Sequence, residues 1–369
     1  MRKLLVTGGA GFIGANFVRH LLHSDPQISV VTLDRLTYAG TQTSLHGLPP
    51  QRHHFVHGDI CDAELVSKLL HDHALDTIVH FAAESHVDRS IAAPGEFVRT
   101  NVVGTYTLLE AARTAWLAPA RRGESARFHH VSTDEVYGSL APDAPPFSEA
   151  TAYDPRSPYS ASKAASDHLA SAYHHTYGLP LTISNCSNNY GPYQFPEKLI
   201  PLLIVNALHG RELPIYGDGG QIRDWLYVED HCRGIERVLR DGRPGQTYNI
   251  GGGNQWRNLD LCRRLCRMID ETFAADARLR ERFPAAAAAQ GGRTCDTIRF
   301  VADRPGHDRR YAIDAAKIRR ELDFGPAADF DSGIRKTLEW YLDNDWGWRP
   351  LLSADYRRWL AQNYTARVK

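Results

Sequence analysis

Short apolar runs alternate with helix-length segments along the first half of the chain. The runs end in small or polar residues and do not alternate strictly between apolar and polar positions, which predicts strands buried on both faces of a sheet. We expect strands at 4–7, 30–34, 54–59, 77–83, 128–133 and 181–185, and helices at 12–23, 62–73, 95–116 and 157–177. Helical crossovers between parallel strands cover both faces, so the pattern predicts an α/β fold with a doubly wound parallel sheet.

After about residue 190 the apolar pattern loosens into pieces punctuated by glycine and proline. Such pieces, at 189–196, 215–221, 249–254 and 304–308, are typical of loop-built ligand surfaces. We therefore predict a nucleotide-binding region over 1–190 that also carries the catalytic residues, and a smaller, loop-rich substrate-binding region over 191–369. Segments of the second region can interleave with the first. The low-complexity stretch 276–293 is expected to be a solvated excursion without chemistry.

Composition is that of a folded soluble protein, with 43% hydrophobic and 23% charged residues in a chain of 369. The 43 basic residues balance 43 acidic ones, which argues against a protein that binds nucleic acid or a membrane surface. Apolar runs fall short of the roughly 20 residues needed to cross a bilayer. The N-terminus is interpreted as the first strand, not as a signal peptide. We expect a cytoplasmic protein.

The cysteines, at 61, 186, 232, 262, 266 and 295, form no CxxC pair, so neither a disulfide framework nor a zinc ribbon is indicated. Cys262 and Cys266 can share one helix face, but no His or acidic partner stands at ligand spacing. We expect these two to be buried thiols and the protein to hold no metal.

A glycine-rich segment directly follows the first predicted strand. Gly9, Gly11 and Gly14 satisfy GxGxxG at a helix start, where backbone N–H groups and the helix dipole favour a pyrophosphate. The second strand ends at Asp34, 20 residues after Gly14, where a carboxylate accepts ribose hydroxyls and repels a 2′-phosphate. A Rossmann-type fold with NAD is therefore expected. Arg35, which could hold a phosphate, keeps NADP as the alternative.

Two further residues form a YxxxK pair on a predicted helix. Tyr159 and Lys163 lie one turn apart on one face, and Thr133 ends the fifth predicted strand. A free Tyr, with a pKa near 10, is a poor base, but a nearby ammonium and the positive nicotinamide are expected to lower that pKa. The pair arises easily by chance; together with the glycine loop and Thr133 it indicates a site that oxidises an alcohol while hydride passes to NAD.

Asp134 and Glu135 come directly after Thr133, at the carboxyl end of the same strand. Oxidation alone does not need them, and a solvated loop pair is the plain alternative. However, once C4 of a sugar is a ketone, elimination of water across C5 and C6 requires a base at C5 and an acid at the C6 hydroxyl. Two adjacent carboxyls can divide that work if their environments separate their pKa values.

These motifs together resemble the extended short-chain dehydrogenase/reductase family, and Thr-Asp-Glu with YxxxK is similar to its nucleotide-sugar 4,6-dehydratases. The likeness runs nearly end to end and includes 85–90, 188–193, 195–201, 223–225 and 303–311. It implies a hydro-lyase that oxidises dTDP-glucose at C4, eliminates water across C5 and C6 and returns the hydride to C6. The product would be dTDP-4-keto-6-deoxyglucose, for deoxysugar biosynthesis such as that of rhamnose.

Three rival functions remain: a 4,6-dehydratase acting on another nucleotide sugar, a 4-epimerase, and a non-catalytic dinucleotide-sensing protein. The acid pair counts against the epimerase. Two segments depart from the family's usual sequence. The segment 276–293 is longer, and the residues 251–257, just before Asn258, differ from those usual in the family. Base and sugar selectivity therefore stay open.

The resemblance also implies site residues and a homodimer packed through the helices near 95–116 and 157–177. It makes Asp134 the acid at C6 and Glu135 the base at C5. The implied catalytic residues are Thr133, Asp134, Glu135, Tyr159 and Lys163. The cofactor-binding residues are Gly8, Gly11, Phe12, Ile13, Gly14, Asp34, Arg35, Leu36, Thr37, Asp59, Ile60, Phe81, Ala82, Ala83, Glu84, Thr100, Tyr159, Lys163 and Asn189. The substrate-binding residues are Ser85, Thr133, Asn188, Glu197, Lys198, Leu199, Pro214, Ile215, Tyr216, Arg223, Asn258, Asp303 and His307.

Overall fold

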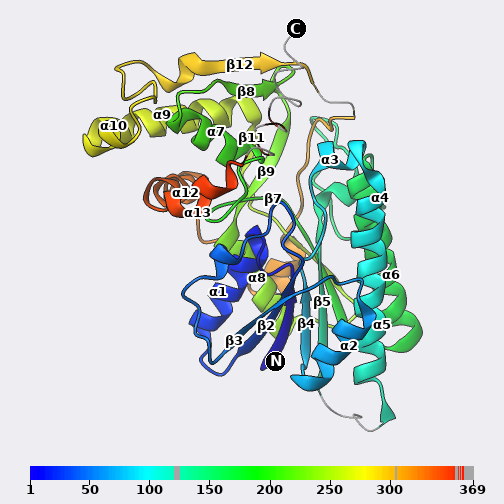
Figure 1. Ribbon diagram of the computed structural model, residues 1–369. Coiled ribbons are helices and arrows are strands. Elements are labelled where there is room, and N and C mark those ends of the chain that lie inside the picture. The colour runs from blue at the N-terminus through cyan, green and yellow to red at the C-terminus, as the bar shows by residue number, and fades with distance from the viewer. Residues whose placement is uncertain (120–124, 304–305, 354–355, 357, 359, 361–369) are drawn as a thin grey trace.

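The computed structural model places a large sheet between helices in one part of the molecule and a smaller lobe above it (Figure 1). It describes residues 1–119, 125–303, 306–353, 356, 358 and 360. Among these residues, no helix is long and apolar enough to span a membrane. No group of three or more His, Cys, Asp or Glu side chains in the described part of the chain is placed to hold a metal ion.

The large sheet has seven strands in the order β10-β6-β5-β4-β1-β2-β3, and every neighbouring pair is parallel. Its strands are β1 (Lys3–Thr7), β2 (Ser29–Asp34), β3 (His53–His57), β4 (Thr77–His80), β5 (Arg127–Thr133), β6 (Leu181–Cys186) and β10 (Thr247–Ile250). The predicted doubly wound sheet is thus confirmed. The strand order reverses between β1 and β4, which is where such sheets bind ligands. The short strand β10 escaped prediction because it lies among glycine-rich loops.

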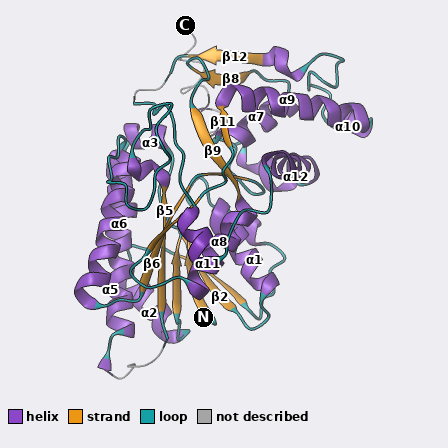
Figure 2. Cartoon of the chain, turned by 180° about the vertical axis from the view of Figure 1, so that it is seen from behind, coloured by secondary structure: helices purple, strands orange, loops and turns teal. Residues whose placement is uncertain are grey.

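Helices cover both faces of this sheet (Figure 2). One face carries α1 (Phe12–Ser24), α8 (Val228–Asp241) and α11 (Ala316–Leu322), and the other α2 (Ala63–Asp72), α5 (Thr105–Trp116) and α6 (Pro158–Tyr177). The helix expected over 95–116 consists of α4 (Pro94–Phe97), a π-helical turn Val98–Gly104 and α5, and α3 (Val87–Ala92) precedes it. π-Helical turns are frequent at functional sites.

Segments from the second half of the chain belong to the core of the large sheet. Val228, Cys232 and Ile235 of α8 are fully buried in the same cluster as Phe17 and Val18 of α1. Residues 228–250 and 316–322 thus cross the predicted division at 190 and complete the first region.

The smaller lobe is built from short strands and helices around its own core. Strands β7 (Asn188–Tyr190), β9 (Ile222–Tyr227) and β11 (Gln255–Arg257) form one sheet, and β8 (Leu213–Tyr216) pairs in parallel with β12 (Ile298–Val301). The helices are α7 (Leu199–Leu208), α9 (Asn258–Ala275), α10 (Arg278–Arg282), α12 (Phe330–Asp343) and α13 (Asp345–Trp348). Helix α7 is apolar all round and buried from Ile200 onward, as a central helix must be.

The segment 276–293 is not the solvated excursion expected from its composition. It contains α10, and its side chains Leu279, Phe283 and Ala286 are buried in the core of the smaller lobe. The ring centroids of Phe283 and Phe273 of α9 lie 6.4 Å apart. These apolar residues recur at helical spacing, but the surrounding alanine run obscured the pattern.

The cysteines are free thiols. Cys262 and Cys266 lie buried on α9, so the expectation for these two is confirmed. Cys61 and Cys295 are partly exposed.

Candidate active site

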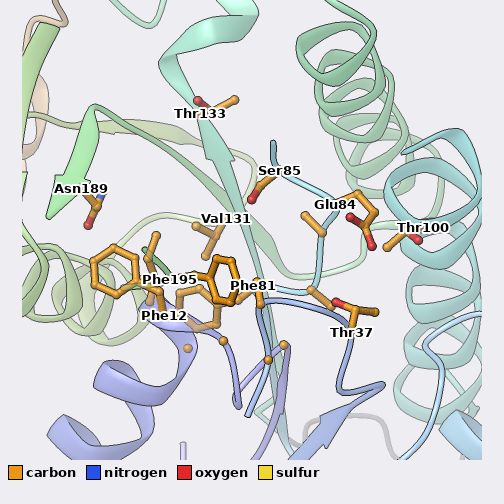
Figure 3. Close-up of a pocket in the computed structure, with 18 of the residues that line it drawn as sticks. Phe12, Thr37, Phe81, Glu84, Ser85, Thr100, Val131, Thr133, Asn189 and Phe195 are labelled. Carbon is orange, nitrogen blue, oxygen red and sulfur yellow. The ribbon is translucent and has the colours of Figure 1, made fainter. Parts of the chain in front are cut away.

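One cleft lies at the carboxyl ends of the central strands, at the reversal of strand order, and reaches toward the smaller lobe (Figure 3). Figure 3 shows Glu84 and Thr100 together on one side, Asn189 on the other, and Thr133 at the end of β5. The predicted residues that line it are Gly8, Gly11, Phe12, Ile13, Gly14, Asp34, Arg35, Thr37, Asp59, Ile60, Phe81, Ala82, Ala83, Glu84, Ser85, Thr100, Thr133, Asp134, Glu135, Tyr159, Lys163, Asn188, Asn189, Glu197 and Lys198.

The glycine turn brings backbone close to backbone at the start of α1. Gly8 has φ +69°, and a Cβ there would lie 2.6 Å from the backbone nitrogen of Ala82. A Cβ on Gly14 would lie 2.3 Å from the carbonyl oxygen of Gly8. Only glycine fits these two positions, and the N-terminus of α1 lines the cleft.

Asp34 ends β2 with its carboxylate fixed by two backbone amides. Oδ2 accepts a hydrogen bond from the Ala10 N–H at 2.9 Å, and Oδ1 accepts one from the Leu36 N–H at 2.8 Å. Leu36 itself has φ +53° and is not among the residues that line the cleft, so its cofactor contact stays a prediction. Its backbone N–H helps to fix the Asp34 carboxylate.

Arg35 is surrounded by carboxylates. Its guanidinium lies 3.3 Å from Asp59, 3.8 Å from Glu84 and 3.9 Å from Glu96. A 2′-phosphate at this position would displace these partners and meet their negative charge. The arrangement therefore favours NAD over NADP.

The π-helical turn positions one wall of the cleft. The Asn101 side chain donates to the carbonyl of Glu84 at 3.0 Å and accepts from the Glu84 N–H at 2.9 Å. Its amide also donates to Ser162 Oγ on α6 at 2.8 Å, while Thr100 lines the cleft beside it. Three separate segments are thereby fixed to each other at the cofactor wall.

The two carboxyls after Thr133 lie in different environments. Thr133 Oγ1 accepts from the Glu135 N–H at 3.3 Å and so caps the 3₁₀ helix Asp134–Tyr137. Asp134 is only 1% exposed, and its Oδ2 has no hydrogen-bond partner among the described residues. Burial, then the charges of Glu135 and Asp224, raise the pKa of Asp134 well above its usual value. Glu135 is partly exposed on the cleft wall. Because its raised pKa keeps it protonated, the Asp134 carboxyl is suited to act as a general acid.

Tyr159 and Lys163 lie on one face of α6, both buried. Burial and the Glu135 charge raise the pKa of Tyr159 well above its usual value, and the Thr133 hydroxyl opposes that rise. Burial lowers the pKa of Lys163, whose Nζ donates to the carbonyl of Val131 at 2.9 Å. The expected lowering of the phenol pKa depends on the nicotinamide charge as well as on the ammonium, so it stays a prediction.

The other predicted substrate residues lie outside this cleft, in the smaller lobe. The Tyr216 and His307 rings meet edge to face at 5.9 Å, and His307 Nδ1 lies 2.6 Å from Asp303 Oδ1. The Tyr216 hydroxyl donates to Asp88 of α3 at 3.4 Å, which ties the lobe to the large sheet's helices. The residues outside the cleft lining are Leu199, Pro214, Ile215, Tyr216, Arg223, Asn258, Asp303 and His307. Arg304 and Pro305 of the matching segment lie outside the described residues.

Arg223 is buried and holds a loop. Its guanidinium donates to the carbonyls of Ile222 at 2.8 Å and Asp308 at 3.0 Å, and lies 4.3 Å from the Tyr311 ring centroid. Its charge also opposes the rise in the Asp134 pKa.

Several cleft residues were missed from the sequence. Cys186 ends β6 and Ser187 follows it, so the strand-end argument that identified Asp59 and Ile60 after β3 would also have found them. The missed lining residues are Leu33, Ala39, Gly40, Gly58, Val131, Ser132, Cys186, Ser187, Gln194 and Phe195. A neighbouring cluster was also missed: the Arg89 guanidinium lies 3.7 Å from the Tyr38 ring centroid and donates to Glu197 Oε2 at 3.2 Å.

Known proteins resemble the whole chain. The profile of the GDP-mannose 4,6 dehydratase family matches residues 5–337. The dTDP-glucose 4,6-dehydratase of Shigella flexneri is 54% identical over 99% of each chain. The crystal structure of the Streptomyces venezuelae dTDP-glucose 4,6-dehydratase, with NAD and dTDP bound, is 48% identical with a TM-score of 0.81, covering 95% of this chain and 99% of that one. The UDP-glucose 4-epimerase of Thermotoga maritima is 25% identical with a TM-score of 0.76, covering 92% of this chain and 99% of its own.

Proposed function

The chain belongs to the GDP-mannose 4,6 dehydratase family, and we propose that it works as a dTDP-glucose 4,6-dehydratase, a hydro-lyase that uses NAD. The observation that carries this function is the acid pair after β5, with Asp134 buried and Glu135 on the cleft wall. An epimerase needs only oxidation and re-reduction at C4, for which this pair has no use.

Each step of the reaction has a suitable group in the cleft. Tyr159 removes the proton of the C4 hydroxyl, which Thr133 orients, and Lys163 stabilises the phenolate. When bound, NAD accepts the hydride from C4 and returns it to C6, so the cofactor is regenerated in every cycle. Glu135 removes the C5 proton, and Asp134, kept protonated by burial, protonates the leaving C6 hydroxyl. A proton returns to C5 when the hydride reaches C6.

Cofactor binding is assigned to the glycine turn and the ends of β2 to β4. The fixed carboxylate of Asp34 takes the ribose hydroxyls, and the N-terminus of α1 takes the pyrophosphate. The carboxylates around Arg35 support NAD.

Nucleotide-sugar binding is assigned to the junction between the cleft and the smaller lobe. Lys198, whose Nζ donates to the Ser85 carbonyl at 3.1 Å, lines the cleft and suits a diphosphate. Asn258 begins α9, and its Oδ1 is buried with no partner among the described residues, so it can accept a hydrogen bond from the ligand. The Tyr216 and His307 rings offer an apolar wall nearby.

A homodimer is proposed through the face formed by α3, the π-helical turn, α5 and α6. These elements stand side by side at one edge of the molecule (Figure 1). Five large apolar side chains on them are 44 to 53% exposed, namely Ile91, Val98, Val103, Tyr106 and Tyr177. Covering such a set of exposed apolar residues favours association. Light scattering should give twice the mass of one chain, and Val98→Asp with Val103→Asp should yield monomers.

A cytoplasmic location is proposed on the free thiols, which suit a reducing compartment.

The function is tested by mass spectrometry of purified protein incubated with dTDP-glucose in deuterated water, without added NAD. The expected product has lost one water and carries one solvent deuterium. UDP- and GDP-sugars serve as parallel substrates. If one of these loses water and dTDP-glucose does not, the proposed substrate is wrong but the proposed mechanism is supported. No reaction even with NAD supplied would refute the proposed activity.

The acid pair is tested separately with Glu135→Gln. This variant should keep NAD bound and lose exchange of the C5 proton with solvent. Normal turnover would remove Glu135 from its role.

A further inference from the structure

A buried carboxylate lies one helical turn beyond Lys163. Asp167 on α6 is 2% exposed, and its Oδ2 accepts hydrogen bonds from Ser132 Oγ at 2.7 Å and the Tyr153 hydroxyl at 3.0 Å. Its Oδ1 lies 3.0 Å from His130 Nε2. Hydroxyls and a neutral imidazole N–H stabilise a carboxylate without cancelling its charge. In the described part of the chain no Lys or Arg lies within 4.0 Å of Asp167.

Lys163 is a buried ammonium in need of a counter-charge. It is 3% exposed, its Nζ donates to a backbone carbonyl, and no carboxylate of the described residues lies within 4.0 Å of it. An isolated buried ammonium loses its proton readily, because burial disfavours the charged form. Residues four apart on a helix share one face, which places the Asp167 carboxylate beside Lys163.

We propose that Asp167 is a positioning residue whose ionised carboxylate keeps the Lys163 ammonium charged and thereby sets the pH at which Tyr159 acts as a base. The inference rests on the proposed roles of Tyr159 and Lys163. It explains why a carboxylate is retained in the core next to the sheet, where an ion without an ion partner destabilises the fold.

The other titratable groups around this pair do not supply the charge. Burial raises the pKa of the Cys186 thiol far above neutral, so that group is uncharged, and burial keeps His130 and His80 neutral by lowering their pKa values well below the usual one. Tyr137 and Tyr153 are held neutral by burial, which raises their pKa values. The groups facing the pair are Tyr159 and His168 on α6, His130 on β5, His80 on β4, Cys186 on β6, Tyr153 in the loop before α6, and Tyr137 on the 3₁₀ helix.

Asp167 is ionised in the range where the reaction needs it. Burial raises its pKa to about 6, while Lys163, Ser132 and Tyr153 oppose that rise. Above that pH the carboxylate is charged and supports the ammonium, which in turn opposes the high pKa of Tyr159. Below it, Lys163 loses its counter-charge and the phenol becomes a weaker base.

The test is Asp167→Asn in the full chain loaded with NAD. With dTDP-6-deoxyglucose, which has no C6 hydroxyl to eliminate, the reaction stops after oxidation, and absorbance of the reduced nicotinamide reports that step alone. We expect the acid limb of the rate profile to move up by about one pH unit or more, which is about a tenfold loss of rate at a fixed pH below the limb. The rate should recover as pH rises.

Two variants provide controls. Asp167→Glu restores the charge and should bring the acid limb back toward that of the wild type. Tyr153→Phe removes one neutral donor from the same carboxylate and keeps the charge, so its acid limb should stay within a few tenths of a unit.

A purely structural role predicts a different result. Because ionising a carboxyl whose pKa is raised opposes folding, Asp167→Asn should not lower the melting temperature above pH 6. A variant that melts earlier and loses rate equally at every pH, with its limb unmoved, would overturn the inference. If the wild type itself fails to reduce NAD with this analogue, the proposed function fails first.

Discussion

The cofactor cleft and the smaller lobe differ in how their functional residues come together. In the cleft, many of them stand at the carboxyl ends of parallel strands: Asp34 and Thr133 end β2 and β5, and Asp59 comes just after β3. Tyr159 and Lys163 are added to this edge by α6. In the smaller lobe, Tyr216, Asn258 and His307 come from a strand, a helix start and a loop that share no rule of order. The sheet thus makes the chemistry predictable, while substrate recognition depends on loops.

The comparison predicts that the largest catalytic loss comes from the cleft. Tyr159→Phe removes the base for the C4 hydroxyl and should lower kcat about a thousandfold, because general base catalysis contributes about 10²- to 10⁴-fold. NAD should stay bound, since the glycine turn and Asp34 are untouched. Steady-state rates and the nicotinamide content of the purified protein check this, and turnover close to the wild type would contradict it.

The smaller lobe should show its largest effect on stability. Phe283→Ala removes a ring buried against Phe273 and should lower the free energy of unfolding by about 3 kcal/mol or more, as measured in urea. Arg280→Ala, on the exposed side of α10, is the matched control and should stay within about 0.5 kcal/mol. Equal losses of unfolding free energy in the two variants would show that 276–293 contributes nothing to the core of the smaller lobe.

The glycine turn should affect the cofactor alone. Gly14→Ala places a methyl 2.3 Å from the Gly8 carbonyl oxygen and should weaken NAD binding about a hundredfold, equal to about 2.7 kcal/mol. Gly95→Ala meets no atom within 4 Å and has no positive φ, so it should bind NAD as the wild type does. Calorimetry on cofactor-stripped protein gives both constants; a Gly14→Ala protein with unaltered affinity would disprove the tight turn.

The smallest catalytic effect is expected in the lobe. His307→Ala removes the contacts to Asp303 and the Tyr216 ring, and should raise KM for dTDP-glucose about tenfold with kcat within about twofold, because such contacts bind substrate and transition state alike. Initial rates over a range of substrate concentrations measure both constants. A fall in kcat as large as that of Tyr159→Phe would contradict the assignment of catalysis to the cleft and of substrate binding to the smaller lobe.

Much of the fold was readable because buried parallel strands have a plain apolar signature. All six expected strands form, the doubly wound sheet is confirmed, and so is the resemblance to the nucleotide-sugar 4,6-dehydratases. Strand β10 was missed because four residues among glycines carry too little pattern. The burial of Phe283 was missed because alanines surround it.

The sequence predicted where the site residues lie better than it predicted their pKa values. Sequence order places Thr133 and Tyr159 near one another, but it does not show how dry their surroundings are, and burial is what raises the Tyr159 pKa. The turn at Leu36 was equally hidden, because φ +53° at a branched side chain follows from contacts to Asp34 and not from its own preference.

The π-helical turn Val98–Gly104 contributes residues both to the cofactor cleft and to the proposed dimer face. Thr100 lines the cofactor cleft and Asn101 holds Glu84, while Val98 and Val103 stand exposed on the proposed dimer face. In the proposed dimer, a second copy packed on those valines would restrain the backbone that lines the cleft. Dilution below the dimer's dissociation constant should then loosen NAD, so the amount of protein a cell makes would itself regulate how much of it is loaded.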